Sequence, residues 1–179
     1  LDSIQIRLRD VRYTNLDISG QVDELAAVAP GGFALTGAEG RIFFSPDTVR
    51  AEALQFTTTR SRLSLPTALI TLPDTSGRLD DMRLQLHLEE ASIAPRDVAY
   101  FVPQLRDYEI VRRNLDRPLR LWVETNGTLA DLQVRRFQFQ GWYSRLALRG
   151  RLAYPTDPER LRTDLQLVDL EVAAAELRE

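Results

Sequence analysis

The 179-residue sequence contains no cysteine and no lysine, and His87 is its single histidine. Without cysteine, the chain can form neither a disulfide bond nor a thiolate metal site. His87 alternates onto the polar side of a predicted strand, so we expect a solvated side chain and not a metal ligand or a catalytic base. We therefore predict that the chain is not an enzyme and has no catalytic residue, no bound metal and no cofactor.

The carboxylates also lack a catalytic arrangement. They occur as neighbouring pairs at Asp80-Asp81 and Glu89-Glu90. Neighbours on a strand point to opposite faces, so neither pair can flank one glycosidic bond. The loop around Gly77 lacks the ligand spacing of a calcium site, and we interpret it as a hairpin turn.

Long apolar runs and an excess of one charge are missing as well. No run is long enough to cross a bilayer, and we expect no signal peptide within this sequence. The formal charge is −3 with acidic and basic residues mixed along the chain, which excludes a basic footprint for nucleic acid. Hydrophobic residues make up 44% of the chain, enough to bury a core. Both ends interrupt predicted elements, so we expect a segment of a longer protein.

Apolar and polar residues alternate from one end of the chain to the other, which is typical of strands with one buried face. Turn-forming residues such as those at 45–48 separate the alternating stretches. The pattern predicts about ten strands and a mainly β fold built as a curved antiparallel sheet with one or two short helices. The alternating stretches that mark these strands are residues 4–8, 16–22, 33–35 with 41–44, 48–58, 62–72, 82–88, 119–125, 127–141, 146–152 and 161–172.

The stretch GTLADLQVRRFQFQG changes its apolar face halfway along. Leu132 and Val134 occupy even positions, whereas Phe137 and Phe139 occupy odd ones. A β-bulge at Arg135-Arg136 would absorb one residue and return all four apolar side chains to one face. The alternative is two separate strands, but no turn residue lies between them. We therefore predict one bent strand, with the glycines at 127, 141 and 150 relieving crowding where the sheet curves.

One internal stretch, residues 94–102, is typical of a helix, because Pro95 suits a first turn and Pro103 limits its length. The sequence LQLHLEEAS leads into this helix, and LQLVDLEVA at 165–173 leads into a second expected helix. An internal repeat of this kind, a strand followed by a helix, is typical of stacked, open-ended β architecture.

With this internal repeat, we predict three structural units within one continuous segment. Residues 1–93 form a first β-sheet unit, and residues 94–118 form the short helix and its connector. Residues 119–179 form a second β-sheet unit that runs into the start of a further repeat.

Several motifs together resemble one family. The run NGTLADLQVRRFQFQG followed by LALRGRL resembles the patterns G-T-L-x-D-L, L-x-L and L-x-L-x-G-x-L of the TamB/AsmA-like translocation and assembly module family. The earlier GFAL and ALQFTTTRSRLSL resemble its G-F-x-L and L-x-L-x-T-x-x-S-x-L-x-L run, and PRDVAYFVP resembles its short D-x-x-x-F-x-P helix. The resemblance covers residues 20–177.

This resemblance implies a periplasmic segment of an inner-membrane-anchored protein, with a taco-like β-groove whose interior is apolar. It implies a role in phospholipid transport between membranes, in outer-membrane protein assembly, or in both. The implied partners are phospholipid acyl chains and a TamA-type outer-membrane protein, the latter through regions absent from this chain.

An apolar groove can hold acyl chains by burial alone, at about 0.8 kcal/mol per CH₂ group. The same apolar positions would instead form an ordinary closed core if a second layer covered them. The candidate groove-lining residues are Leu84, Leu86, Leu88, Leu119, Leu121, Val123, Phe137, Phe139, Leu146 and Leu148.

A soluble β-sandwich that binds carbohydrate or protein is the alternative function. Trp122, Trp142 and Tyr143 would then form an aromatic platform for the ligand. The simpler interpretation is that these rings brace the outside of the sheet.

Overall fold

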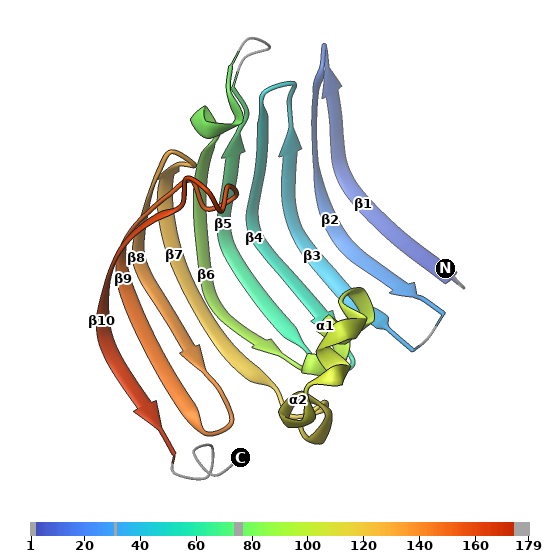
Figure 1. The fold of residues 1–179 in the computed structure, drawn as a ribbon. Helices are drawn as coiled ribbons and strands as arrows, with labels where there is room; N and C mark the ends of the chain where they lie inside the picture. The colour runs from blue at the N-terminus through green and yellow to red at the C-terminus, as the bar shows by residue number, and fades with distance from the viewer. Residues whose placement is uncertain (1–2, 31, 74–76, 174–179) are drawn as a thin grey trace.

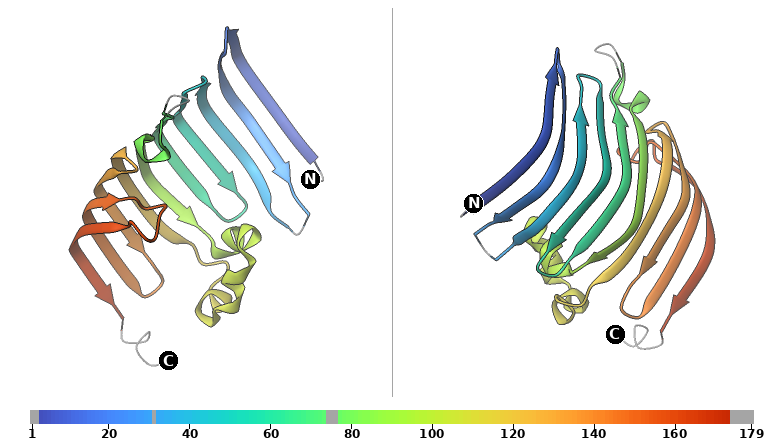
Figure 2. Two further views of the ribbon diagram at one scale, coloured as in Figure 1. Left: turned by 45° about the horizontal axis from the view of Figure 1, so that its top comes forward. Right: turned by 180° about the vertical axis from the view of Figure 1, so that it is seen from behind.

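The computed structural model describes residues 3–30, 32–73 and 77–173, which form a single ten-stranded antiparallel sheet with the strands in chain order (Figure 1). This confirms the predicted mainly β fold and the predicted number of strands. The strands are β1 (Ser3–Thr14), β2 (Asp17–Val28), β3 (Ala34–Phe44), β4 (Thr48–Thr58), β5 (Arg62–Thr71), β6 (Arg83–Ile93), β7 (Leu119–Thr128), β8 (Asp131–Gln140), β9 (Ser144–Ala153) and β10 (Arg162–Val172). The strands bend along their length, but the sheet is neither closed nor strongly curled (Figure 2).

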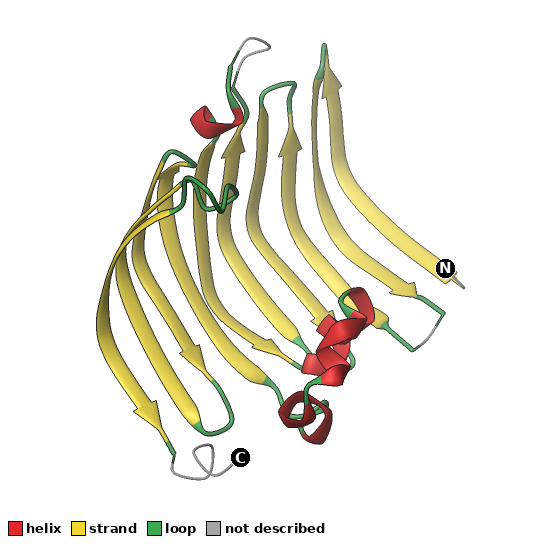
Figure 3. Ribbon diagram, viewed as in Figure 1, coloured by secondary structure: helices red, strands yellow, loops and turns green. Residues whose placement is uncertain are grey.

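The helical segments are short and lie outside the sheet (Figure 3). The predicted helix is present as α1 (Pro95–Phe101), and it is followed by the 3-10 turn η2 (Pro103–Asp107) and α2 (Glu109–Arg113). Another 3-10 turn, η1 (Leu79–Asp81), precedes β6. None of these described helices has the length and apolar character needed to cross a membrane. The second expected helix, after residue 173, lies outside the described residues.

The two predicted sheet units belong to one sheet. Strands β6 and β7 pair directly, although α1, η2 and α2 lie between them in the sequence. These helices form an excursion at one end of the sheet (Figure 2). The alternative β-sandwich is wrong for the described residues, because a sandwich needs two stacked sheets and all ten strands share one.

The predicted β-bulge at Arg135-Arg136 is confirmed. Val134 lies opposite Gly150 on β9, and Phe137 lies opposite Leu148, so three steps on β8 match two steps on β9. Strand β8 runs through the bulge without a turn, and the two-strand alternative is therefore wrong. The extra residue returns both phenylalanines to the face that Leu132 and Val134 occupy.

Similar register shifts recur in six of the nine strand pairings. In β6, for example, Leu88 lies opposite Val123 and Ala91 lies opposite Leu121. Each bulge bends its strand and increases the local twist. The repetition explains how strands of ten to twelve residues bend while keeping their apolar side chains on one face.

Glycine is required at three strand positions. Gly40, Gly127 and Gly150 have φ values of 146°, 132° and 144°, a region that side-chain-bearing residues rarely adopt. A Cβ atom on Gly150 would lie 2.1 Å from the backbone oxygen of Asp164 on the neighbouring strand. The predictions for 127 and 150 therefore have a direct steric reason. Gly141 lies in the turn after β8 without a positive φ, and a Cβ atom there would lie 2.9 Å from the Ser144 hydroxyl oxygen and 3.2 Å from the Phe139 ring.

We predict that Gly150→Ala lowers the free energy of unfolding by at least about 2 kcal/mol, because the new methyl group clashes with backbone and the φ angle is strained. Gly37→Ala is the matched control, since a Cβ atom there meets nothing within 4 Å. The control should change stability by less than about 1 kcal/mol. Urea unfolding of both variants checks this, and equal effects would contradict the steric account.

Candidate functional site

The ten predicted groove-lining residues all lie on one face of strands β6 to β9. Leu88, Val123, Phe137 and Leu148 are successive cross-strand partners and form one row across the four strands. Leu121, Phe139 and Leu146 form the next row. Leu84, Leu86 and Leu119 lie on the same face, opposite Gly127, Thr125 and Ile93. We call the side of the sheet that these ten residues occupy the apolar face.

The apolar face is only partly shielded from solvent. Leu88 is 7% exposed, and the other nine predicted residues are half-buried. No large side chain among the described residues is fully buried, although closely packed cores normally bury several. Helices α1 and α2 lie at one end of the sheet and the turn η1 at the other, and none of them covers the middle of either face (Figures 1 and 2). Between the two alternatives, this exposure favours an open face over a closed core.

The apolar face extends beyond the predicted set in both directions. On β5, Ile70 and Ala68 lie opposite Leu84 and Leu86, and the same face continues through β4 to β1. At the other side it ends on β10, where Leu167 is 52% exposed. The same alternation marks these strands in the sequence, so the pattern that selected the ten residues could also have found the others.

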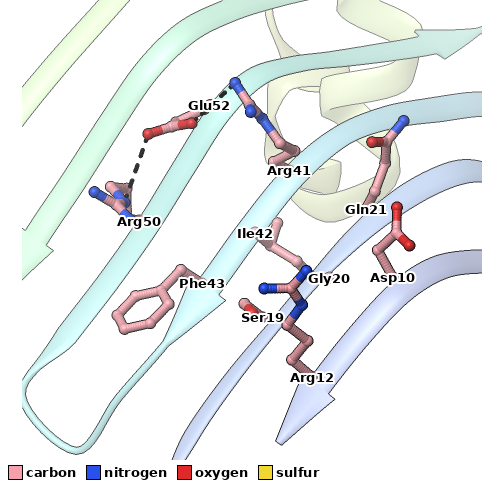
Figure 4. A pocket seen from close by; sticks show the side chains of 10 residues that line it. All are labelled: Asp10, Arg12, Ser19, Gly20, Gln21, Arg41, Ile42, Phe43, Arg50 and Glu52. Atoms are coloured by element: carbon pink, nitrogen blue, oxygen red, sulfur yellow. Dashed lines mark ion pairs between the residues drawn. The ribbon is translucent and has the colours of Figure 1, made fainter.

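The opposite face is polar and carries rows of arginines and carboxylates. Arg41 and Arg50 both reach Glu52, with closest nitrogen–oxygen distances of 3.1 Å and 3.6 Å (Figure 4). These side chains line an open hollow of about 540 Å³ over β1 to β4. His87 is exposed on this face, as predicted. Exposed ion pairs of this kind contribute little to stability, so the polar face is best described as a solvated surface.

The three aromatic residues of the predicted carbohydrate platform have separate surroundings. Trp122 lies in β7, where the guanidinium of Arg136 approaches its ring. Trp142 lies in the turn after β8, and its indole Nε1–H donates to the Arg117 carbonyl at 2.9 Å. Tyr143 lies beside the guanidinium of Arg117. The described rings therefore brace the sheet and its connector, which favours the simpler interpretation.

A buried carboxylate attaches α1 to the end of the sheet. Asp97 is 7% exposed and accepts hydrogen bonds from Thr58 Oγ1 at 2.6 Å and Ser61 Oγ at 2.5 Å. The Ala94 backbone N–H donates to the same serine hydroxyl at 2.9 Å. These contacts connect the start of the helix to the turn between β4 and β5, and the sequence alone did not indicate them.

A bidentate ion pair links the two ends of the connecting segment, residues 94–118. Arg96 Nε and Nη2 each lie 2.6 Å from one oxygen of Asp116, and Arg60 Nε lies 3.1 Å from the same carboxylate. The hydrogen bonds from Arg96 are the main cause that lowers the pKa of Asp116 below its ordinary value. The same interaction raises the pKa of Arg96.

We predict that Asp116→Asn destabilises the protein at neutral pH and that this effect disappears in acid. A lowered pKa means that the folded state favours the charged carboxylate, so the contribution is complete above the unfolded-state pKa of about 3.9. It is lost as the pH falls through the lower folded-state value. Thermal unfolding across the acid range checks this, with Asp107→Asn as an exposed control.

A difference between wild type and Asp116→Asn that stays constant down to the most acidic pH would contradict the assignment. So would a loss of equal size and equal pH dependence in the control.

The described residues contain no group of three or more histidine, cysteine, aspartate or glutamate side chains able to hold a metal ion. Comparison of the chain with protein-family models, curated proteins and solved structures found no match. The apolar face is thus the feature on which a function can be argued.

Proposed function

We propose that the chain is a non-enzymatic segment of a TamB/AsmA-like envelope protein whose apolar face binds phospholipid acyl chains. Binding would serve phospholipid transport between membranes, outer-membrane protein assembly, or both. The observation that carries the proposal is the continuous row of apolar side chains from Leu88 to Leu148. Leu88 is buried, its three partners in the row are half-buried, and no covering layer lies over them among the described residues. The order of the glycine and leucine motifs along the sequence supports the family.

The free energy of burying apolar surface favours an apolar ligand. Half-exposed leucine and phenylalanine side chains gain about 25 cal/mol for each Å² of apolar surface removed from water. A ligand that needs no hydrogen-bond partner suits the apolar face, because the side chains of this face offer almost no hydrogen-bonding groups. Acyl chains satisfy this condition at about 0.8 kcal/mol per buried CH₂ group.

The dimensions also suit acyl chains. Ten strands spaced about 4.8 Å apart give a face on the order of 40 Å wide. One acyl chain covers about half of the bilayer hydrocarbon core, roughly 15 Å. The face therefore has room for more than one chain, lying along or across the strands.

The bend of the strands supports the proposed groove. The recurring bulges bend the sheet near the middle of its strands, and the proposed groove has the apolar face on its inner side. The polar face, with its arginines and carboxylates, then faces the aqueous periplasm. Contact with a TamA-type partner would involve regions of the protein outside this chain.

The proposal predicts that the purified protein carries phospholipid. Organic extraction followed by mass spectrometry should detect near-stoichiometric phospholipid in the wild type. Leu86→Asp and Phe139→Asp should each lower the bound lipid by about tenfold or more, because a carboxylate on the apolar face must be desolvated against the acyl chains. Gln85→Asp places the same charge on the polar face and should leave the lipid content unchanged.

Circular dichroism establishes that each variant is folded, and Leu86→Ser replaces the aspartate variant if the latter unfolds. Wild-type protein without phospholipid would overturn the proposal. Equal lipid content in the apolar-face and polar-face variants would overturn it as well.

A further inference from the structure

One hollow on the polar face differs in composition from the rest of that solvated surface. It has a volume of about 500 Å³ and lies in the middle of the sheet, at the ends of β4 to β7 beside the connecting segment. Of its ten lining residues, six carry a hydroxyl group, three are arginines and one, Glu90, is acidic. Hydrogen-bond donors therefore dominate its wall.

The strand register places two arginines beside one serine in this hollow. Arg62 on β5 and Arg120 on β7 both lie opposite Ser92 on β6, and Thr57 on β4 lies opposite Arg62. Neighbouring strands are about 4.8 Å apart, so the backbones of the two arginines are roughly 10 Å apart with the serine midway between them. Their long side chains can therefore approach one ligand above the serine from both sides.

The donor groups of this row are not used within the chain. The side chain of Arg62 forms neither an ion pair nor a hydrogen bond in the part of the chain that the structure describes. Arg120 Nε lies 3.9 Å from Glu90 Oε1, which is too far for a hydrogen bond. Across the described ranges, the hydroxyl groups of Thr57 and Ser92 have no hydrogen-bond partner either. A ligand with several acceptor oxygens would satisfy these donors together.

The wall beside the row is already ordered by α1 and the connecting segment. The hydroxyl groups of Thr58 and Ser61, which also line the hollow, donate to the buried Asp97 at 2.6 Å and 2.5 Å. Arg60 Nε lies 3.1 Å from the Asp116 carboxylate, which fixes the third arginine and balances its charge. A ligand that meets an ordered wall loses less conformational entropy on binding.

We propose that this hollow binds a phosphate group, with Arg62 and Arg120 on either side and the Ser92 hydroxyl below. A guanidinium group presents a planar fork of donors that matches two phosphate oxygens at once. The two arginines outweigh Glu90 by one positive charge, so the hollow attracts an anion. The hydroxyl groups of the row donate to the remaining phosphate oxygens.

Phosphate monoesters and phospholipid head groups share this chemistry, so the test includes a probe of each kind. The site does not need acyl chains on the apolar face, and the inference therefore goes beyond the proposed function. Leu86→Asp, which should carry little phospholipid, should still bind inorganic phosphate.

Isothermal titration with inorganic phosphate and with water-soluble dihexanoyl phosphatidic acid tests the proposal. Wild type should bind both. Arg62→Gln and Arg120→Gln should each raise the dissociation constant about tenfold or more, because each variant loses charge-assisted hydrogen bonds. Glu90→Gln should lower the dissociation constant several-fold, because it removes the carboxylate that repels the ligand. Tighter binding of phosphatidic acid identifies a head group as the ligand, and tighter binding of inorganic phosphate identifies a free phosphate compound.

Arg83→Gln is the matched control. Arg83 is also exposed on the polar face of β6 and forms no ion pair within the described residues, but it lies at the opposite end of the strand. Its replacement should leave the dissociation constant unchanged. Thermal unfolding verifies that each variant is folded. Arg62→Lys replaces the glutamine variant if the latter unfolds, and it should also bind more weakly because lysine lacks the planar fork.

A folded wild-type protein that binds neither probe would overturn the proposal. Equal weakening by Arg83→Gln and Arg62→Gln would also overturn it, because the attraction would then belong to the polar face as a whole. Wild type without phospholipid that still binds inorganic phosphate would leave this inference standing while removing the proposed function. If Leu86→Asp loses its phospholipid as expected but binds no phosphate, this inference fails and the proposed function stands.

Discussion

The structure depends on keeping apolar side chains on one face of strands that bend. A bulge bends a strand by adding one residue, so a sequence with strict two-residue alternation would turn every apolar side chain after the bulge to the opposite face. The bulge at Arg135-Arg136 inserts one residue in β8, and register shifts also occur in four pairings that do not involve β8. Gly150 makes the close approach of backbone possible where a side chain would clash. The continuous apolar face and the bend of the strands both follow from the bulges.

A single-layer sheet of this kind has an unusual stability problem. Its apolar side chains pack against cross-strand neighbours, but no second layer removes their outer surfaces from water among the described residues. The connector helps at one end, where Asp97 and the Arg96–Asp116 pair hold α1 in place. The remaining exposed apolar surface is the part of the molecule that we propose acyl chains cover.

Much of the fold could be predicted from the sequence, because alternation and turn residues are local signals. The strand count, the bulge at Arg135-Arg136 and the helix between Pro95 and Pro103 all followed from such signals. Whether the apolar face is covered could not be predicted, since an open face and a closed core have the same alternation. The contact of Trp142 with the Arg117 carbonyl and the hydrogen bonds of Asp97 join segments far apart in sequence, so no local pattern indicated them.

The central claim is that the apolar face contacts acyl chains and the polar face does not. A fluorophore attached to Val123→Cys or to Glu124→Cys reports on the two faces of β7 at neighbouring positions. Phospholipid with brominated acyl chains should quench the fluorophore at 123 several-fold more strongly than at 124. Equal quenching at both positions, or none at 123, would contradict the account.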